Sequence, residues 1–408
     1  MMIKRRSLLK GMIVAPAAFA MGGALDATSA LAAPSPLPGP SLLDVTYPPK
    51  DDFGLVPMDK ALNSDTRWAD LITALKRTLP NSSVDTVLDS ANRFGTDGDL
   101  PDTPPRVDHW FWQSGDRNDD YWYPQGLTTS ADHLAEGTYN GREVQLLSWY
   151  SKHEKNKGVR ISFVDMSDPS APAYRHVLLV EPTGSTLTPN FTEVKIHAGG
   201  IMWYGDLLYV VDTNNGLRIF DLNDLLKVTT GDQDAIGRQS DGTFQAHDYA
   251  YVLPQSSAYN SVVHDQAAIA YSWISLDRTS TPDSIVIGEF RETEDSESRL
   301  FKWDLDYQTR RLKESNGVAH PSFAAIVDID RMQGGTCIND KFYVVRSNTD
   351  NQDGNLLTWE PGSYVEYPMN LPPYPEDVSY DPNKDWLWCN TETNDARQVF
   401  ALKVSQIG

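Results

Sequence analysis

The chain has 408 residues, with 35 Lys and Arg against 56 Asp and Glu, and a formal net charge of −21. A chain this acidic repels nucleic acid and anionic lipid, so neither is expected as a partner. Beyond the first 32 residues no segment approaches the apolar length of a membrane-spanning helix, so no membrane association is expected once those residues are removed.

The first residues, MMIKRRSLLKGMIVAPAAFAMGG, join a basic start to an apolar stretch that is too short to cross a bilayer. The following ALAAP offers an A-x-A cleavage site before Ala33. Residues 1–32 are therefore interpreted as an export signal, and Arg5 and Arg6 resemble the twin-arginine class. An ordinary secretory signal with a chance Arg pair is the alternative. Either signal predicts a secreted or periplasmic protein.

Residues 33–105 are predicted to be a leader with a short helical extension. The stretch from Ala33 to Asp52 is rich in Pro and Ser, which indicates a flexible lead. The segment SDTRWADLITALKRTL spaces its apolar residues three and four apart. It predicts one amphipathic helix, capped by Ser64 or Asp65, with an apolar face made of Trp68, Leu71, Ile72, Leu75 and Leu79.

Residues 106–408 are predicted to form an all-β domain. From Trp110 onward, short apolar or alternating runs such as EVQLLSWY, VRISFVDM and KFYVVRS are separated by Asp, Asn and Gly turns. The clearest repeat, HAGGIMWYGDLLYVVDTNNGLRIFDL, has weaker copies that begin PQGL, MQGGT and PEDV. This repeat predicts a β-propeller of five to seven blades, with Trp and Tyr residues filling the gaps between blades. A β-sandwich with long loops is the alternative.

Aligning the copies gives Gln125, His197, Gln333 and Glu376 equivalent places at the start of an innermost strand. The small residues after the first three would let neighbouring backbones crowd the axis. A further blade is expected around AAIAYSWISLDRTSTPDSIVIGEF, in the long interval between His197 and Gln333.

Polar side chains that converge on a propeller axis from several blades suit a metal or a small polar ligand. Gln125, His197, Gln333 and Glu376 are therefore candidate ligands of a divalent metal. Imidazole favours Zn or Mn, whereas Ca prefers oxygen ligands throughout. Alternatively, the same groups hydrogen-bond one another and close the propeller.

Other candidates are weaker. His109, in VDHWFWQ, either reaches over the channel mouth as a catalytic group or packs in an aromatic cluster. Arg278 either stabilises its own turn or binds an anionic group, and Arg346 and Glu392 end second strands, where one propeller face commonly gathers functional groups. Cys337 and Cys389 form one disulfide or remain two buried thiols.

The elements YPQGL and MQGGT resemble two propeller groups, the glutaminyl cyclotransferases with their T-Q-G-L element and the regucalcin and lactonase group with P-E-G. The second resemblance implies an axial calcium, but Gln125 stands where that group has Glu. The polar set is also chemically similar to oligogalacturonate-lyase-like propellers, in which His and Gln surround a divalent metal. The whole chain most resembles uncharacterised exported bacterial proteins, which imply a propeller but no reaction.

No G-x-S-x-G elbow, H-E-x-x-H helix, Walker loop or dinucleotide fingerprint occurs, which argues against the common serine hydrolase, zincin, nucleotide and nicotinamide functions. The first hypothesis is a monomeric exported enzyme, a hydrolase or lyase for a small organic or carbohydrate substrate. His197 would act as base, Glu376 as acid, and Gln125, Gln333, Arg278 and Arg346 would hold the substrate. The competing hypothesis is a noncatalytic propeller that binds a protein or glycan partner.

Overall fold

The computed structural model describes residues 37–98, 105–292, 297–348 and 352–407. The chain divides into two units, Met1–Pro34 and Ser35–Gly408, and the fold below is that of the second unit alone. The expected export signal, residues 1–32, lies outside the described residues. Within them, no helix is both long and apolar enough to cross a membrane.

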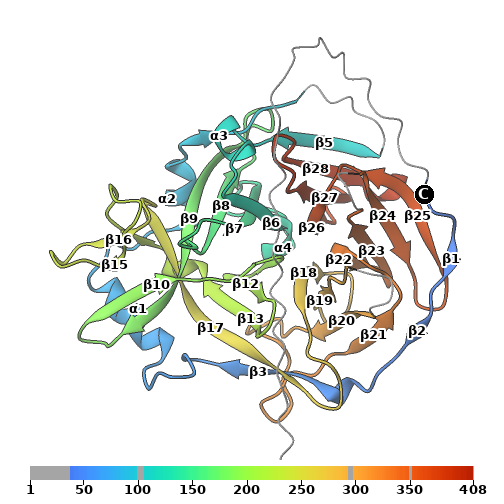
Figure 1. Cartoon of the computed structure of the whole chain (residues 1–408), viewed down its shortest axis with the longest axis horizontal. Helices are drawn as coiled ribbons and strands as arrows, with labels where there is room; N and C mark the ends of the chain where they lie inside the picture. Colours follow the sequence, from blue (N-terminus) through green and yellow to red (C-terminus); the bar gives the residue numbers. More distant parts are fainter. Residues whose placement is uncertain (1–36, 99–104, 293–296, 349–351, 408) are drawn as a thin grey trace, which may run out of the picture. The chain divides into compact units, whose positions relative to one another are not determined.

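Five inner strands form a closed ring, which gives a five-bladed β-propeller (Figure 1). Each inner strand contacts the next, and the last contacts the first. They are β6 (Trp122–Thr129), β11 (Ile201–Tyr204), β18 (Tyr271–Asp277), β22 (Met332–Ile338) and β26 (Pro375–Asp381). The predicted all-β propeller is thus confirmed, and β18 belongs to the blade expected in the long middle interval.

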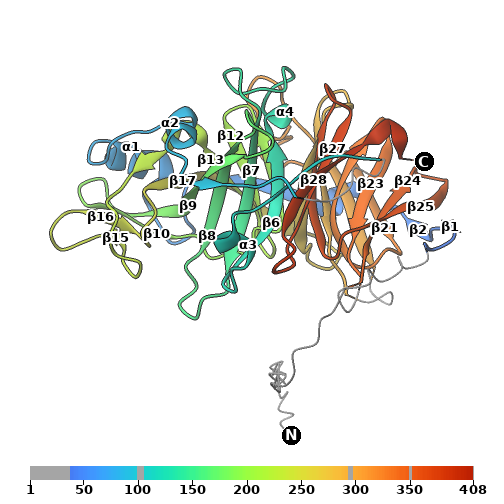
Figure 2. The ribbon, with the colours of Figure 1, turned by 90° about the horizontal axis from the view of Figure 1, so that it is seen from above.

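Each inner strand begins an antiparallel sheet of four main strands. Blade 1 continues with β7 (Val144–Ser151), β8 (Val159–Asp165) and β9 (Ala173–Gly184), and blade 2 with β12 (Leu207–Asp212), β13 (Gly216–Asp221) and β17 (Tyr251–Val263). Blade 3 continues with β19 (Ser284–Glu289), β20 (Ser298–Asp304) and β21 (Phe323–Val327), and blade 4 with β23 (Lys341–Arg346), β24 (Gly354–Trp359) and β25 (Tyr364–Leu371). Seen from the side, strands of blades 1, 4 and 5 run roughly upright (Figure 2).

Blade 5 joins the two ends of the propeller domain. Its strands are β26, β27 (Trp386–Thr391), β28 (Gln398–Lys403) and β5 (Arg106–Phe111). The early strand β5 pairs antiparallel with β28, and Trp110 lies opposite Val399. Because the outer strand of the last blade comes from the start of the domain, the ring is closed by backbone hydrogen bonds.

The segment before β5 is built into the outer edges of the blades. Strands β1 (Ser41–Leu42), β2 (Val45–Thr46) and β3 (Phe53–Met58) pair with β25, β21 and β17. The predicted flexible lead is therefore wrong for residues 41–46. Outer strands of a blade present unpaired backbone groups, which an extended segment satisfies whatever its composition.

Short strands and helices lie between and beside the main strands of the blades. The strands are β4 (Arg93–Phe94), β10 (Pro189–Glu193), β14 (Leu226–Lys227), β15 (Ile236–Arg238) and β16 (Phe244–Ala246). The helices are α1 (Trp68–Lys76), α2 (Val84–Asp89), α3 (Ser114–Arg117) and α4 (Ser130–His133), with 3-10 turns at Lys50–Asp52, Leu222–Asp224 and Val404–Gln406. Strands β9 and β17 pair in parallel and connect blades 1 and 2.

Helix α1 has the predicted amphipathic face. Trp68, Leu71, Ile72 and Leu75 are buried, and the helix contacts β9, β10 and β17. The predicted cap is wrong, because Arg67 occupies the N-cap and makes no capping hydrogen bond. The Ser64 hydroxyl instead accepts a hydrogen bond from the Thr66 backbone in the preceding turn.

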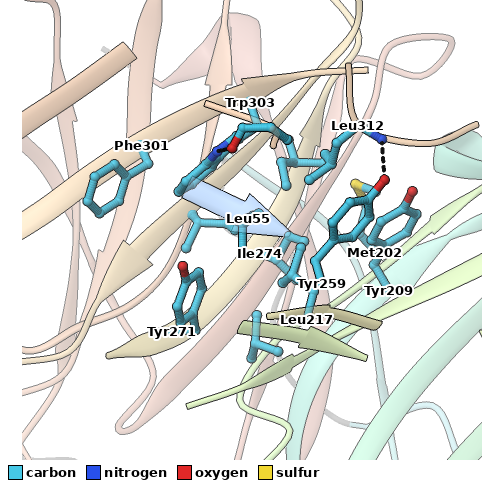
Figure 3. Packing of buried hydrophobic residues seen from close by; sticks show 14 of the residues in the cluster. Leu55, Met202, Tyr209, Leu217, Tyr259, Tyr271, Ile274, Phe301, Trp303 and Leu312 are labelled. Carbon is cyan, nitrogen blue, oxygen red and sulfur yellow. Dashed lines mark hydrogen bonds between the residues drawn. The ribbon is translucent and has the colours of Figure 1, made fainter. Parts of the chain in front are cut away.

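Large aromatic side chains fill the spaces between neighbouring blades. Figure 3 shows the cluster between blades 2 and 3, where Tyr209 and Tyr259 pack near Trp303 and the Tyr259 hydroxyl accepts a hydrogen bond from the Leu312 backbone at 3.2 Å. Between blades 5 and 1, Trp112 packs edge-on against Trp149 at 4.7 Å. Aromatic packing between blades, as predicted, therefore accounts for much of the Trp and Tyr content.

Glycines let the inner strands approach one another closely. A Cβ on Gly334 of β22 would lie 2.5 Å from the Glu376 carbonyl oxygen, and one on Gly126 of β6 would lie 2.6 Å from the Ile201 nitrogen. A Cβ on Gly200 would likewise collide with the Ile274 nitrogen. The small residues predicted to allow crowding at the axis are therefore required by close backbone contacts.

We expect Gly334→Ala to lower the free energy of unfolding by about 1–3 kcal/mol, because backbone atoms of the next blade cannot move aside as a flexible side chain would. Gly115→Ala is the matched control, since nothing lies within 4 Å of its added Cβ. Urea unfolding of both variants measures the difference. Equal stabilities would show that the ring of inner strands relaxes freely.

Candidate active site

A cavity of about 750 Å³ lies at the starts of the inner strands. We call it the axial cavity. All five blades contribute to its wall, which includes Gln125 and Tyr150, His197 and Asp212, Ser272, Gln333, and Glu376 with Glu392. The structure therefore brings together the four residues that the repeat alignment placed at the axis. Their chemical roles stay predictions.

Glu376, in β26, carries the most perturbed carboxyl of the cavity wall. The side chain is buried, and among the described residues nothing hydrogen-bonds to its buried Oε1. Burial raises its pKa well above the usual value, and the nearby Glu392 and Asp377 raise it further, while Lys152 opposes them. These influences favour the protonated form of the carboxyl, in which it can donate a proton.

Glu392 follows β27 and lies in a different electrostatic setting. Its Oε2 accepts a hydrogen bond from Gln125 Nε2 at 2.7 Å. Burial raises its pKa, whereas Lys152, the Gln125 hydrogen bond and Arg397 lower it. Glu392 thus has a donor and two cations to support a negative charge, but Glu376 has Lys152 alone.

His197 stands in the loop before β11, where it is exposed and lines the cavity. Its ring lies 4.4 Å from that of Tyr150, at an angle of 45°. The surrounding protein desolvates the imidazole and, together with Lys152, lowers its pKa to about 4. The ring is therefore neutral near pH 7, and no hydrogen bond to it is found within the described part of the chain.

Two cations that sequence reasoning missed act on these groups. Arg397 is fully buried, and its Nε donates to the Glu392 carbonyl at 3.0 Å. The Lys152 ammonium lies 3.4 Å from the centre of the Tyr123 ring. Lys152 comes directly after β7, which ends as Tyr150 and Ser151. The comparison of second-strand ends that picked out Glu392 and Arg346 would have found this position as well.

Asp377, next to Glu376 in β26, hydrogen-bonds to two neighbouring inner strands. Its Oδ2 accepts hydrogen bonds from the Leu127 nitrogen at 3.2 Å and the Ile201 nitrogen at 3.1 Å. One side chain of blade 5 therefore connects the inner strands of blades 1 and 2. Because Glu376 is the next residue along β26, these bonds also position its backbone.

Three other predicted site residues lie outside the cavity wall. His109, in the outer strand β5, has Nε2 3.0 Å from the Gly98 carbonyl. Arg278 donates to the Asp132 carbonyl at 2.6 Å, and Arg346 donates from Nε to Asp330 at 2.7 Å. Each of these three side chains contacts a neighbour away from the axis. For His109, packing in an aromatic cluster therefore fits its position better than a catalytic role. For Arg278, stabilisation of its own turn fits better than binding of an anionic group.

The comparisons with known proteins add little to the contacts described above. No family model and no curated protein matches the chain. Among solved structures, the GH43_1 enzyme from Xanthomonas citri complexed with xylotriose is 8% identical, with a TM-score of 0.31, over 81% of this chain and 92% of that one.

The β-propeller domain of Myceliophteria thermophila Cps50 (Swd1) is 7% identical, with a TM-score of 0.32, over 69% of this chain and 96% of that one. Likenesses at this level carry no argument about activity. The resemblances to glutaminyl cyclotransferases and lactonases hold only at the level of a β-propeller, which the strand pairing of this chain establishes.

The predicted metal ligands combine one His and one Glu with two Gln side chains. Among the residues that the structure describes, no three His, Cys, Asp or Glu side chains are grouped to hold a metal. The Gln125 amide nitrogen is already bound to Glu392, and that of Gln333 lies 3.3 Å from the Ser347 hydroxyl. A Zn, Mn or Ca site stays a prediction, and no catalytic step below depends on one.

The two cysteines lie in different cores. Cys337 in β22 and Cys389 in β27 are both free and buried. Burial raises the pKa of the Cys337 thiol to about 12. The structure therefore agrees with the alternative of two buried thiols, neither of which is a reactive nucleophile.

Proposed function

We propose that this chain is an exported β-propeller enzyme that cleaves a carbohydrate by acid–base catalysis in the axial cavity. The observation that carries the proposal is the pair of carboxyls, with Glu376 buried and unpartnered and Glu392 held by a donor and two cations. Burial raises the pKa of both carboxyls, but that of Glu376 is raised well above its usual value, whereas Lys152, Gln125 and Arg397 oppose the rise at Glu392. A pair of carboxyls in unlike environments, one the better acid and one the better base, is what glycosidic bond cleavage requires. The amide and hydroxyl groups of the wall suit a polyhydroxylated substrate.

In the proposed reaction, Glu376 gives its proton to the leaving oxygen as the bond from that oxygen to carbon breaks. In the hydrolytic form, a water adds to the anomeric carbon and its proton passes to the Glu392 carboxylate. In the eliminating form, a base removes a ring proton beside a carbonyl, and neutral His197 is the group that can accept it. Gln125 holds Glu392 in place in both forms.

The noncatalytic alternative receives less support. It requires a closed axis and a patch of exposed aromatics on one face. His197 is exposed in the cavity, and the exposed aromatics in the described part of the chain come from separate elements, among them Phe94 in β4, Tyr307 after β20 and Tyr364 in β25. These features favour turnover in the cavity over partner binding.

A panel of aryl glycosides and acidic and neutral polysaccharides tests the proposal. Reducing-end release without an unsaturated product indicates hydrolysis, whereas absorbance from a new carbon–carbon double bond indicates elimination. Measurable turnover that Glu376→Gln lowers strongly on the polysaccharides supports the proposal. Glycan binding by calorimetry without turnover would overturn it in favour of a binding protein.

The pH dependence of kcat/KM tests the direction in which Lys152 shifts the pKa values of the site. Lys152 lowers the pKa values of Glu376, Glu392 and His197. We therefore expect Lys152→Gln to raise all three and to move both limbs of the pH profile to higher pH. Lys155→Gln, on the same loop but paired with Asp234 at 3.2 Å, is the control and should leave the profile unchanged. Limbs that move in opposite directions would contradict the assignment.

A further inference from the structure

A second pocket, of about 300 Å³, is lined mainly by basic and imidazole side chains. We call it the lateral pocket. Three bases and three histidines line it, together with Trp122, Tyr249 and several polar residues. They are Arg93, Lys157, Arg175, His153, His176 and His247. Asp248 is the sole acid among its described lining residues, which is unusual in a chain of net charge −21.

Two of the three bases that line the lateral pocket, Lys157 and Arg175, form no ion pair within the described residues. Within the described residues, the half-buried Lys157 ammonium makes no hydrogen bond and no ion pair. The Arg175 guanidinium donates to the Ser90 carbonyl at 2.6 Å and has no acidic partner there. Within the described residues the pocket therefore holds at least two positive charges that form no ion pair.

Arg93 does have an acidic partner, but that partner is shared. Asp116 lies 3.0 Å from Arg93 Nε and 2.9 Å from Arg160 Nη2. One carboxylate thus serves two guanidiniums, which leaves a surplus of positive charge beside the pocket. This surplus adds to that of Lys157 and Arg175.

His247 contributes a buried group without a partner. Its Nδ1 lies 3.1 Å from the Gln233 carbonyl, so Nδ1–H donates there and a neutral ring leaves a lone pair on Nε2. Nε2 is buried and has no partner among the described residues. Protonation of Nε2 beside an anion would convert this orphan acceptor into a donor.

We propose that the lateral pocket binds an oxyanion, such as a sulfate or phosphate group carried by a small organic molecule. Lys157 and Arg175 supply the charge, and His247 supplies a donor once it is protonated. The pocket has the volume of about ten water molecules at roughly 30 Å³ each, which leaves space for a group attached to the oxyanion. This site is independent of the acid–base chemistry proposed for the axial cavity.

Calorimetric titration of the full chain with sodium sulfate tests whether the positive charge of Lys157 contributes to anion binding. We expect Lys157→Gln to weaken sulfate binding about tenfold or more, because a charge-assisted contact is lost. Lys155→Gln is the matched control, since Lys155 lies on the same loop but does not line the pocket and pairs with Asp234. It should change the affinity by less than about twofold. Equal losses in both variants, or no sulfate binding by the wild type, would overturn the proposal.

The pH dependence tests the role of His247. Burial and Lys157 lower its pKa, whereas the Gln233 carbonyl and the carboxylates of Glu193 and Asp234 raise it. His153 on the β7–β8 loop also lies near. Sulfate stays a dianion between about pH 5.5 and 7.5. Tighter sulfate binding at about pH 5.5 than at about pH 7.5 therefore reflects protonation of the protein and not of the ligand. We expect His247→Gln to remove that difference, and a difference that persists would contradict the role.

Three further titrants distinguish a free oxyanion from an organic ester as the ligand. Inorganic phosphate, glucose 6-phosphate and glucose 6-sulfate each present an oxyanion, and glucose is the uncharged control. Tighter binding of the esters than of the free anions, all weakened by Lys157→Gln, supports a pocket for an ester. Tighter binding of the free anions would reject the organic part of the ligand, and binding of glucose alone would reject the oxyanion.

Discussion

Replacing Glu376 by Gln should lower kcat by about 10²- to 10⁴-fold, which is the usual contribution of a positioned general acid. The amide keeps the shape of the carboxyl but has no acidic proton to give to the leaving oxygen. Stability should stay the same or rise, because the change removes an ionisable group that is buried without a partner at Oε1. Steady-state kinetics and thermal unfolding of the same preparation measure both effects.

The leaving group of the substrate makes this test more specific. Activated aryl glycosides need little protonation, so Glu376→Gln should lose much less activity on them than on alkyl glycosides. Glu366→Gln, on the exposed face of β25, is the control and should behave as wild type. Equal losses on both classes of substrate would mean that Glu376 shapes the cavity and does not donate the proton.

The fold was largely predictable because blades repeat. The strand beginning at Ile201 and its partners share one pattern of apolar runs and turns, and that pattern led to the inner strands of four blades. The outer strands β1 and β2 were not predictable, since two-residue pairings depend on the open edges of distant strands and not on the composition of residues 41–46.

The axial site was predictable in position but not in chemistry. Register alone placed Gln125, His197, Gln333 and Glu376 together. It gave no sign that Glu376 Oε1 lacks a partner or that Lys152 and Arg397 influence Glu392, because burial and charge proximity arise only when the ring closes. His109 was selected for its residue type, and its position in an outer strand depends on the pairing of β5 with β28.

The closure of that ring leads to the largest expected effect on stability. Asp377→Ala removes the acceptor of two buried backbone N–H groups, on Leu127 and Ile201, each of which costs about 1–3 kcal/mol when left unpaired. We expect the free energy of unfolding to fall by roughly 2–5 kcal/mol. Urea unfolding measures this loss in the free energy of unfolding, and it needs no activity assay.

Asp377→Asn separates hydrogen bonding from charge. The amide oxygen can accept the same two bonds, so this variant should stay within about 1 kcal/mol of the wild type or exceed it. Equal losses in the Ala and Asn variants would show that the carboxyl acts through its charge or its fit and not as an acceptor.

The sign of the pH dependence follows from the raised pKa of Asp377, which burial causes. Between the ordinary carboxyl pKa of about 4 and the raised value, the folded state holds a proton that the unfolded state has released. The wild type therefore loses the stability that comes from this bound proton as pH rises. The Asp377→Asn variant has no such proton and does not lose it. The stability of the Asn variant relative to the wild type should increase from about pH 4.5 to 7.5, and a constant difference would mean that Asp377 is ionised in the folded ring.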